Sequence, residues 1–190
     1  MQHGTTHGGA PASPPPEFSR FVSADRVQRG EVVEEITAGE AERRALAARF
    51  ELEAIDRLTA TVRLSRVRGE MVRVSGELEA EVVQTCVVTL EPVRNTVSER
   101  FEALFAPDAL LPDYGDEIDI DACMLDEEMP EAMDNGRIDI GELTAQHLSL
   151  ALDPYPRAPG VEPPSAEEVD ASPDARPNPF AVLERLKRPH

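Results

Sequence analysis

Carboxylates are the side chains of this sequence whose number and spacing could do chemistry. Residues 107–142 carry thirteen acidic residues against one basic residue, and carboxylate oxygens are the ligands that Ca²⁺ prefers. The spacing Asp119-x-Asp121 matches the start of a calcium-binding loop, but that loop needs glycine at its sixth position and glutamate at its twelfth, where this chain has Met124 and Pro130. We therefore predict no metal site and no cofactor. We interpret residues 107–136 as an acidic loop that contacts a partner through Asp116, Glu117, Asp119, Asp121, Asp126, Glu127 and Glu128.

Nucleophiles and bases are few, and none belongs to a recognised catalytic motif. The chain has no nucleophile elbow, no glycine-rich phosphate loop, no HExxH and no paired CxxC. His147 is the only histidine in a segment predicted to fold, and it lies on the apolar side of a predicted helix, where a packing role is expected. Cys86 lies in an apolar run and is interpreted as a small hydrophobic residue. We predict no catalytic residue and do not expect an enzyme.

Arginines on two alternating stretches are the candidates for contact with nucleic acid. Residues 57–82 alternate apolar and polar side chains on both sides of a turn, which predicts a β-hairpin with one apolar face. A three-residue loop, 68–70, keeps both apolar sets on that face and places Arg57 opposite Glu81. This register predicts cross-strand ion pairs on a solvated face. The alternative is an RNA-binding face that uses Arg63, Arg66, Arg68 and Arg73.

The end of the sequence combines a proline-rich stretch with a short amphipathic motif. Residues 153–179 contain eight prolines, and we interpret residues 155–177 as a stiff, extended linker. Asn178 can cap a helix with Pro179 at its first position, so residues 178–190 are predicted to form a short helical motif. We predict that this motif binds a partner through Phe180, Val182, Leu183, Leu186 and Lys187.

Charge is the strongest global feature of the chain. The net charge of −18 and the isoelectric point near 4.5 make it poorly suited to grip phosphate backbones, so a basic partner is expected. Only two cysteines are present, and the first 22 residues hold no apolar segment typical of a signal peptide, which predicts a cytoplasmic protein. No apolar run approaches the roughly 20 residues that span a bilayer, so no membrane association is expected.

One helix is specified by every local signal. Asp139 is predicted as its N-cap and Glu142 as the other half of a capping box. An apolar stripe follows through Leu143, His147 and Leu150, until Pro154 forbids further helix. The helix needs an apolar surface to cover, and the strand-rich stretch upstream is the only one available. That contact is predicted to organise the fold.

The remaining elements predict an α+β fold in which one or two helices cover an antiparallel sheet. We expect strands at residues 18–27 and 31–36, then a helix to about residue 49 capped by Thr37 and Glu40, and a further strand at residues 93–105 after the hairpin. The predicted organisation is a disordered arm at residues 1–17, a single domain at 18–154 that includes the acidic loop, the linker at 155–177, and the motif at 178–190.

Three passages together resemble the YceD family, bacterial and plastid proteins linked to accumulation of large-subunit ribosomal RNA. The first reads VQTCVVTLEPV at residues 83–93, the second spans residues 136–156 from GRIDIGEL to LALDPYP, and the third reads NPFAVLERLK at residues 178–187. Many members carry Cys-x-x-Cys where this chain has Cys86-x-x-Thr89, so a two-thiolate metal or redox role cannot operate here. The resemblance implies a factor for synthesis, processing or stability of this RNA.

These observations support three functional hypotheses. The leading one is a non-enzymatic ribosome biogenesis factor whose acidic loop shields a basic ribosomal protein or assembly factor while the C-terminal motif docks elsewhere. The alternative is direct binding of RNA, such as a large-subunit ribosomal RNA precursor, by the arginine-bearing sheet face. The third is a metal-assisted hydrolase that uses Asp119 and Asp121, although these carboxylates lack an evident scaffold.

Overall fold

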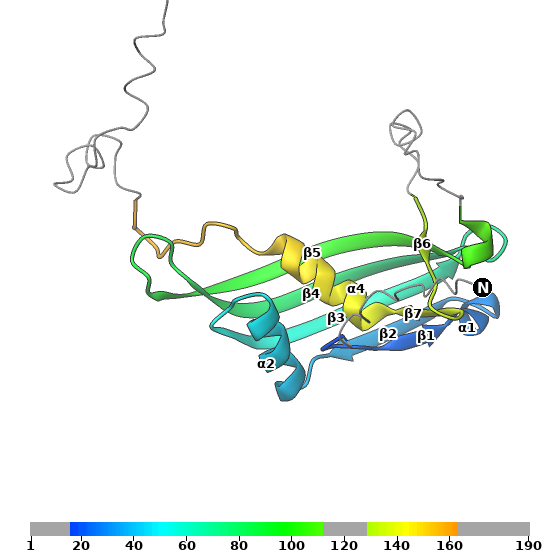
Figure 1. Ribbon diagram of the computed structural model, residues 1–190, viewed down its shortest axis with the longest axis horizontal. Coiled ribbons are helices and arrows are strands. Elements are labelled where there is room, and N and C mark those ends of the chain that lie inside the picture. The colour runs from blue at the N-terminus through cyan, green and yellow to red at the C-terminus, as the bar shows by residue number, and fades with distance from the viewer. Residues whose placement is uncertain (1–15, 112–128, 163–190) are drawn as a thin grey trace, which may run out of the picture.

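The computed structural model describes residues 16–111 and 129–162, which form a mixed α+β domain built on one large sheet (Figure 1). Five strands lie in the order β2-β3-β4-β5-β6, and a separate two-stranded sheet pairs β1 with β7. Neighbouring strands from β2 to β5 are antiparallel, whereas β6 is parallel to β5. The predicted α+β class and antiparallel sheet are confirmed.

The strands are β1 (Phe21–Ser23), β2 (Val32–Thr37), β3 (Ala54–Arg66), β4 (Val72–Thr85), β5 (Pro92–Ala106), β6 (Glu131–Ala132) and β7 (Arg137–Asp139). The helices are α1 (Ala24–Gln28), α2 (Glu40–Arg49), α4 (Ile140–Ala151) and the short 3-10 helix η1 (Asp108–Leu110).

The β3–β4 hairpin has the predicted register. Arg57 lies opposite Glu81, and the Val67 N–H donates to the Met71 carbonyl at 3.1 Å, which leaves a loop of three residues, 68–70. Gly69 takes a φ of +57° in this loop, a backbone conformation that glycine adopts without steric cost. The register follows from burial, because a shift of one residue would turn the apolar side chains of both strands to water.

The hydrophobic core lies between one face of the sheet and the helices. α4 crosses β4 and β5, and α2 packs beside β3 (Figure 1). The Phe101 ring of β5 occupies the space over Gly76 of β4, where an added Cβ would lie 2.3 Å from the ring. His147 of α4 stacks on Phe101 with ring centroids 4.6 Å apart, and burial lowers its pKa, although the nearby Glu99 and Glu131 charges act to raise it. This histidine therefore has the packing role expected for it.

The N-terminal part of the chain differs from the prediction in two places. The strand predicted over residues 18–27 ends at Ser23, which caps α1 by accepting a hydrogen bond from the Asp25 N–H at 3.3 Å. The predicted Thr37 cap is also wrong, because Thr37 is the last residue of β2 and pairs with Thr59. Gly39 occupies the N-cap of α2, and strand pairing thus takes precedence over the local capping pattern.

The α4 helix begins where predicted, but its buried side is rotated. Asp139 is the N-cap and accepts hydrogen bonds from the N–H groups of Gly141 and Glu142. The Glu142 side chain does not complete a capping box, because its carboxylate binds Arg49 of α2 at 2.9 Å. Leu150, predicted to lie on the apolar stripe, is 81% exposed. The side chains that face the core are Ile140, Leu143, Thr144, Ala145 and Leu148.

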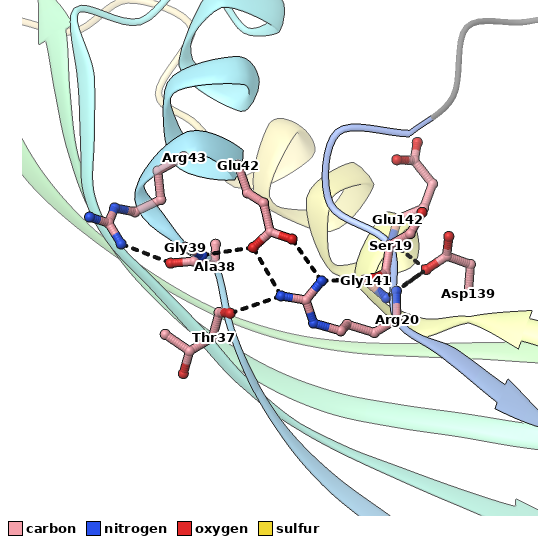
Figure 2. A network of polar contacts seen from close by, with 10 residues as sticks. All are labelled: Ser19, Arg20, Thr37, Ala38, Gly39, Glu42, Arg43, Asp139, Gly141 and Glu142. Carbon is pink, nitrogen blue, oxygen red and sulfur yellow. Dashed lines mark hydrogen bonds and ion pairs between the residues drawn. The ribbon is translucent and has the colours of Figure 1, made fainter.

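A polar cluster centred on Arg20 joins three distant parts of the chain (Figure 2). The Arg20 guanidinium forms a bidentate ion pair with Glu42 of α2, at 2.7 and 2.9 Å, and also donates to the Thr37 carbonyl. The Arg20 backbone N–H donates to the Asp139 carboxylate at 2.8 Å, and the Ile140 N–H donates to the Arg20 carbonyl. The segment before β1 therefore fixes α2 and α4 relative to each other.

We expect that Gly141→Ala destabilises the fold by about 2 kcal/mol, since overpacking typically costs this much. An added Cβ would lie 2.6 Å from the Phe18 carbonyl oxygen and 2.8 Å from the Arg20 nitrogen, and backbone atoms cannot move aside cheaply. Urea unfolding measures the free-energy change. Gly30→Ala is the control, because no atom lies within 4 Å of the added Cβ. Stabilisation by Gly141→Ala would show that helix propensity outweighs the close approach.

A second prediction concerns acid stability. The Arg20 hydrogen bonds lower the pKa of Glu42, and the Gly39 N–H acts in the same direction while burial opposes them. This contribution is therefore present above the unfolded-state pKa of about 4.3 and is lost as pH falls through the lowered folded-state pKa. We expect Glu42→Gln to be about 1 kcal/mol less stable than the parent at pH 7. Urea unfolding should show this difference shrinking below pH 4, and a pH-independent difference would contradict the assignment.

Candidate functional site

The open face of the sheet, opposite the core, carries three of the arginines that sequence analysis singled out, Arg57, Arg63 and Arg73. Along β3, β4 and β5, polar side chains alternate with buried apolar ones. The polar side chains point to the open face and the apolar ones to the core. Arg57 binds Glu81 at 3.0 Å and Glu79 at 3.2 Å, as the predicted register requires. The other arginines of this face bind carboxylates in the same way: Arg63 with Glu31 at 3.0 Å, Arg73 with Glu102 at 2.6 Å and Arg100 with Glu77 at 2.6 Å.

A hollow in the described part of the chain lies on this face. Its volume is about 530 Å³, and it is lined by the backbones of Gly76 and Phe101 together with polar side chains from three strands. Two arginines and two glutamates alternate around it, so positive and negative charge nearly balance. Such a surface offers polar contacts without a net positive field for phosphate. The charged and hydroxyl side chains of this lining are Thr61, Arg63, Ser75, Glu77, Arg100 and Glu102.

The four arginines predicted as RNA contacts do not form one patch. Arg63 and Arg73 lie on the open face in ion pairs with glutamates. Arg66 lies at the end of the β3–β4 hairpin and donates to the Gly69 carbonyl at 2.7 Å, and Arg68 lies in the three-residue loop. Arg66 and Arg68 form no ion pair within residues 16–111 and 129–162. Among the candidate RNA contacts, these two are the ones without an ion-pair partner in the part of the chain that the structure describes.

The acidic segment leaves and rejoins the domain at this hairpin end. The described chain stops at Leu111, after η1, and resumes at Met129, just before β6. A hollow of about 400 Å³ lies close by, between Glu70 of the hairpin, Pro107 and the α1 helix. The acidic residues predicted to contact a partner lie outside the described residues: Asp116, Glu117, Asp119, Asp121, Asp126, Glu127 and Glu128.

The opposite end of the sheet holds the segment that follows α4. Gln84 donates to the Asp153 carbonyl at 2.9 Å, and the Val87 N–H donates to the Pro156 carbonyl at 2.9 Å. Pro156 is buried. We call residues 153–158 the exit strap, because they hold the chain against the loop between β4 and β5 before it continues towards the C-terminus.

Cys86 lies where the exit strap meets that loop. Its side chain is fully buried, and its Sγ accepts N–H hydrogen bonds from Thr89 and Ala158, each 3.4 Å long. The Thr89 side chain and these N–H groups lower the pKa of the thiol to about 6, against the effect of burial. Thr89, three residues after Cys86, thus contacts the thiol through both its N–H and its side chain. Cys86 was predicted to act only as a small hydrophobic residue. That prediction did not include the hydrogen bond from the Ala158 N–H, because the sequence does not indicate where the exit strap lies.

A groove of about 440 Å³ adjoins the exit strap. Its apolar lining comes from Phe50 and Leu52, after α2, and from Leu152 and Pro156. Glu51 and Asp153 lie at its rim. The residues predicted to bind a partner through the C-terminal motif, Phe180, Val182, Leu183, Leu186 and Lys187, lie outside the described residues.

Comparison with known proteins gives a family. Residues 74–187 match the family model described as large ribosomal RNA subunit accumulation protein YceD. Comparison with curated proteins and with solved structures gives no match. Among the helices of the described residues, none has the length and apolar character to cross a membrane. The match covers more than half of the sequence, from β4 to the C-terminal motif, and the chain therefore belongs to the YceD family.

Proposed function

We propose that this protein is a non-enzymatic, cytoplasmic factor that supports accumulation of large-subunit ribosomal RNA by binding a basic protein. The family is described as a large ribosomal RNA subunit accumulation protein, which links the chain to that RNA. In the proposed mechanism the acidic segment shields the basic surface of a ribosomal protein or assembly factor. The C-terminal motif docks on a second surface of the same particle. No step of this mechanism needs a metal, a cofactor or a catalytic residue.

The observation that carries the proposal is the ion pairing of the open sheet face. Nucleic-acid binding draws its affinity from cations that neutralise phosphates. On this face Arg57, Arg63, Arg73 and Arg100 already bind glutamates at 2.6 to 3.2 Å, so an RNA phosphate would have to displace a carboxylate from each of them. A lysine-rich protein meets no such competition at the acidic segment, since residues 112–128 contain eight carboxylates and no basic residue.

The geometry of the domain supports a two-ended mode of binding. The described chain leaves for the acidic segment at one end of the sheet and for the C-terminal motif at the other (Figure 1). β4 has 14 residues, and strands rise about 3.3 Å per residue, so the two departure points are roughly 45 Å apart. Two weak contacts joined by one rigid domain bind more tightly than either alone, provided that the partner presents both surfaces at this spacing.

The RNA-binding alternative has one observation in its favour. Arg66 and Arg68 lie together at the end of the β3–β4 hairpin, away from the paired arginines of the open face. This pair could contact a phosphate even though the rest of the sheet cannot. The alternative predicts that Arg66→Gln with Arg68→Gln removes RNA from material recovered with the protein.

Neutralising the acidic segment tests the leading proposal. We expect that the variant D116N/E117Q/D119N/D121N recovers ribosomal proteins from lysate about tenfold less well than the parent, because its charge complementarity to basic partners is reduced. Affinity recovery at about 0.15 M salt, with and without ribonuclease, measures protein and RNA separately. The matched control neutralises four exposed carboxylates of the folded domain, Glu35, Glu51, Glu70 and Glu91. Equal loss in both variants, or loss of all ribosomal protein on ribonuclease treatment, would contradict the proposal.

A second prediction concerns the C-terminal motif. We expect that L183D/L186D lowers recovery of the same partner about tenfold without changing domain stability, because both charges would disrupt an apolar helix face in a groove. Leu90→Asp is the control, since Leu90 is an equally apolar side chain with 75% exposure on the folded domain. Recovery that is unchanged in L183D/L186D would remove the docking part of the mechanism and leave the acidic segment as the sole contact.

A further inference from the structure

Along most of one long edge of the sheet, the described residues provide no neighbouring strand. β5 is an outer strand of 15 residues, and β6 pairs only with its last two residues, Phe105 and Ala106. From Pro92 to Leu104, no strand of the described residues pairs with the side of β5 that faces away from β4. An unpaired edge of this length is a template for another strand, and soluble proteins usually cover or shorten such edges.

The pairing pattern identifies the free backbone groups of this edge. The Cys86 N–H donates to the Glu91 carbonyl across the β4–β5 pair, so odd-numbered residues of β5 direct their backbone groups to β4. The Ala106 carbonyl accepts from the Met133 N–H on the other side, which agrees with this assignment. The register has no bulge between Pro92 and Phe105. The outward N–H and C=O groups therefore belong to Arg94, Thr96, Ser98, Arg100, Glu102 and Leu104.

An exposed apolar side chain stands beside the same edge. Leu143, His147 and Leu150 follow one side of α4 at helical spacing. Leu143 shares a hollow with Phe105 and β6, and His147 stacks on Phe101 of β5. Leu150 continues this line beyond the end of β6, and it is 81% exposed. Leu150, which was predicted to face the core, is thus an exposed apolar residue on the same side of α4 as Leu143 and His147.

Charge along β5 favours one way in which a second copy can pair with it, because among registers centred on an outward residue only one forms opposite-charge pairs. In an antiparallel pair centred on Ser98, Arg94 lies opposite Glu102 of the second copy, and this pairing occurs twice. No like charges face each other in that register. Centring on Val97 would place Arg94 opposite Arg100, and centring on Glu99 or Arg100 would place that residue opposite itself. The Arg94 and Glu102 side chains are 78% and 44% exposed, so both are accessible to a second copy.

We propose that the protein forms a twofold symmetric dimer in which the β5 edges of two copies pair antiparallel, centred on Ser98. The two sheets then form one continuous sheet from β2 of one copy to β2 of the other. β6 stays in place, because the pairing spans residues 94–102 and β6 begins opposite Phe105. Leu150 of each copy lies over the joined strands and is removed from water there. This inference does not depend on the proposed function.

Charge exchange between the two copies tests the register. The parent chain should sediment as a concentration-dependent dimer at about 0.15 M salt. Arg94→Glu replaces two opposite-charge pairs by two like-charge pairs and should weaken dimerisation about 30-fold. R94E/E102R restores the opposite charges and should restore the dimer. Arg57→Glu is the matched control, because it makes the same charge change on the same face but on the inner strand β3. The folded state of each variant is checked by thermal unfolding.

Two further variants test the contact itself. Ser98→Cys should form a disulfide-linked dimer under mild oxidation, since directly opposed residues of this kind have Cα atoms about 5.5 Å apart, within the range that a disulfide bridges. Ser149→Cys, on the side of α4 that lines the groove by the exit strap, should not. Leu150→Glu should weaken the dimer, whereas Val33→Glu on the opposite sheet edge should have no effect.

Several results would overturn the proposal. A parent chain that stays monomeric at about 100 μM would show that a second copy does not pair with this edge. The edge would then be open to an extended segment of another protein. A dimer that is insensitive to Arg94→Glu and Leu150→Glu would place the interface elsewhere. Failure of E102R to rescue R94E, in a protein that unfolds at the parental temperature, would exclude the Ser98-centred register.

Discussion

The contact on which the rest of the structure depends is the Asp139 carboxylate at the start of α4. Its Oδ1 accepts hydrogen bonds from the N–H groups of Arg20, Gly141 and Glu142, at 2.8, 3.1 and 3.2 Å. One oxygen thus satisfies two free N–H groups of the helix and ties the helix to a segment 119 residues earlier. Its Oδ2 is buried and has no hydrogen-bond partner within the described ranges, so the link relies on Oδ1.

The position of α4 in turn decides what the two faces of the sheet can do. The α4 helix, β1 and α2 cover one face of the sheet, which leaves the other face open and polar. On the open face, glutamates from neighbouring strands neutralise the arginines at short range. In the sequence, residues 112–128 combine eight carboxylates with no basic residue and so contribute −8 of the net charge of −18. This distribution favours a basic partner at the ends of the domain over a nucleic acid on its sheet.

Sequence reasoning succeeded where one strong local signal coincided with burial. The Asp139 cap and the β3–β4 register were predictable because capping geometry and apolar alternation each allow a single solution. It failed where distant contacts decide between local alternatives. Thr37 has a capping pattern, yet pairing with Thr59 keeps it in a strand. Glu142 suits a capping box, yet Arg49 binds it from another helix.

The candidate binding surfaces were predictable only in part. The arginines and the acidic segment are visible in composition, but their ion pairing depends on β2 and β5 lying beside the hairpin. The exposure of Leu150 follows from which side of α4 faces the core, and the sequence pattern alone did not predict that side correctly. The exit strap was likewise hidden, because prolines predict an extended chain without indicating the surface on which it lies.

Zero-length crosslinking of carboxylates to amines in cell extract tests the central claim most directly. Lys187 is the only lysine of the chain, so the chain offers its own carboxylates almost no amine to react with. Almost every crosslink from a carboxylate of this protein must therefore reach another molecule. Peptide identification then names the partner and the carboxylates involved. The account predicts crosslinks from residues 112–128 to lysines of a ribosomal protein or assembly factor, retained after ribonuclease treatment. Absence of such crosslinks, together with ultraviolet crosslinks from the β3–β4 hairpin to ribosomal RNA, would contradict it.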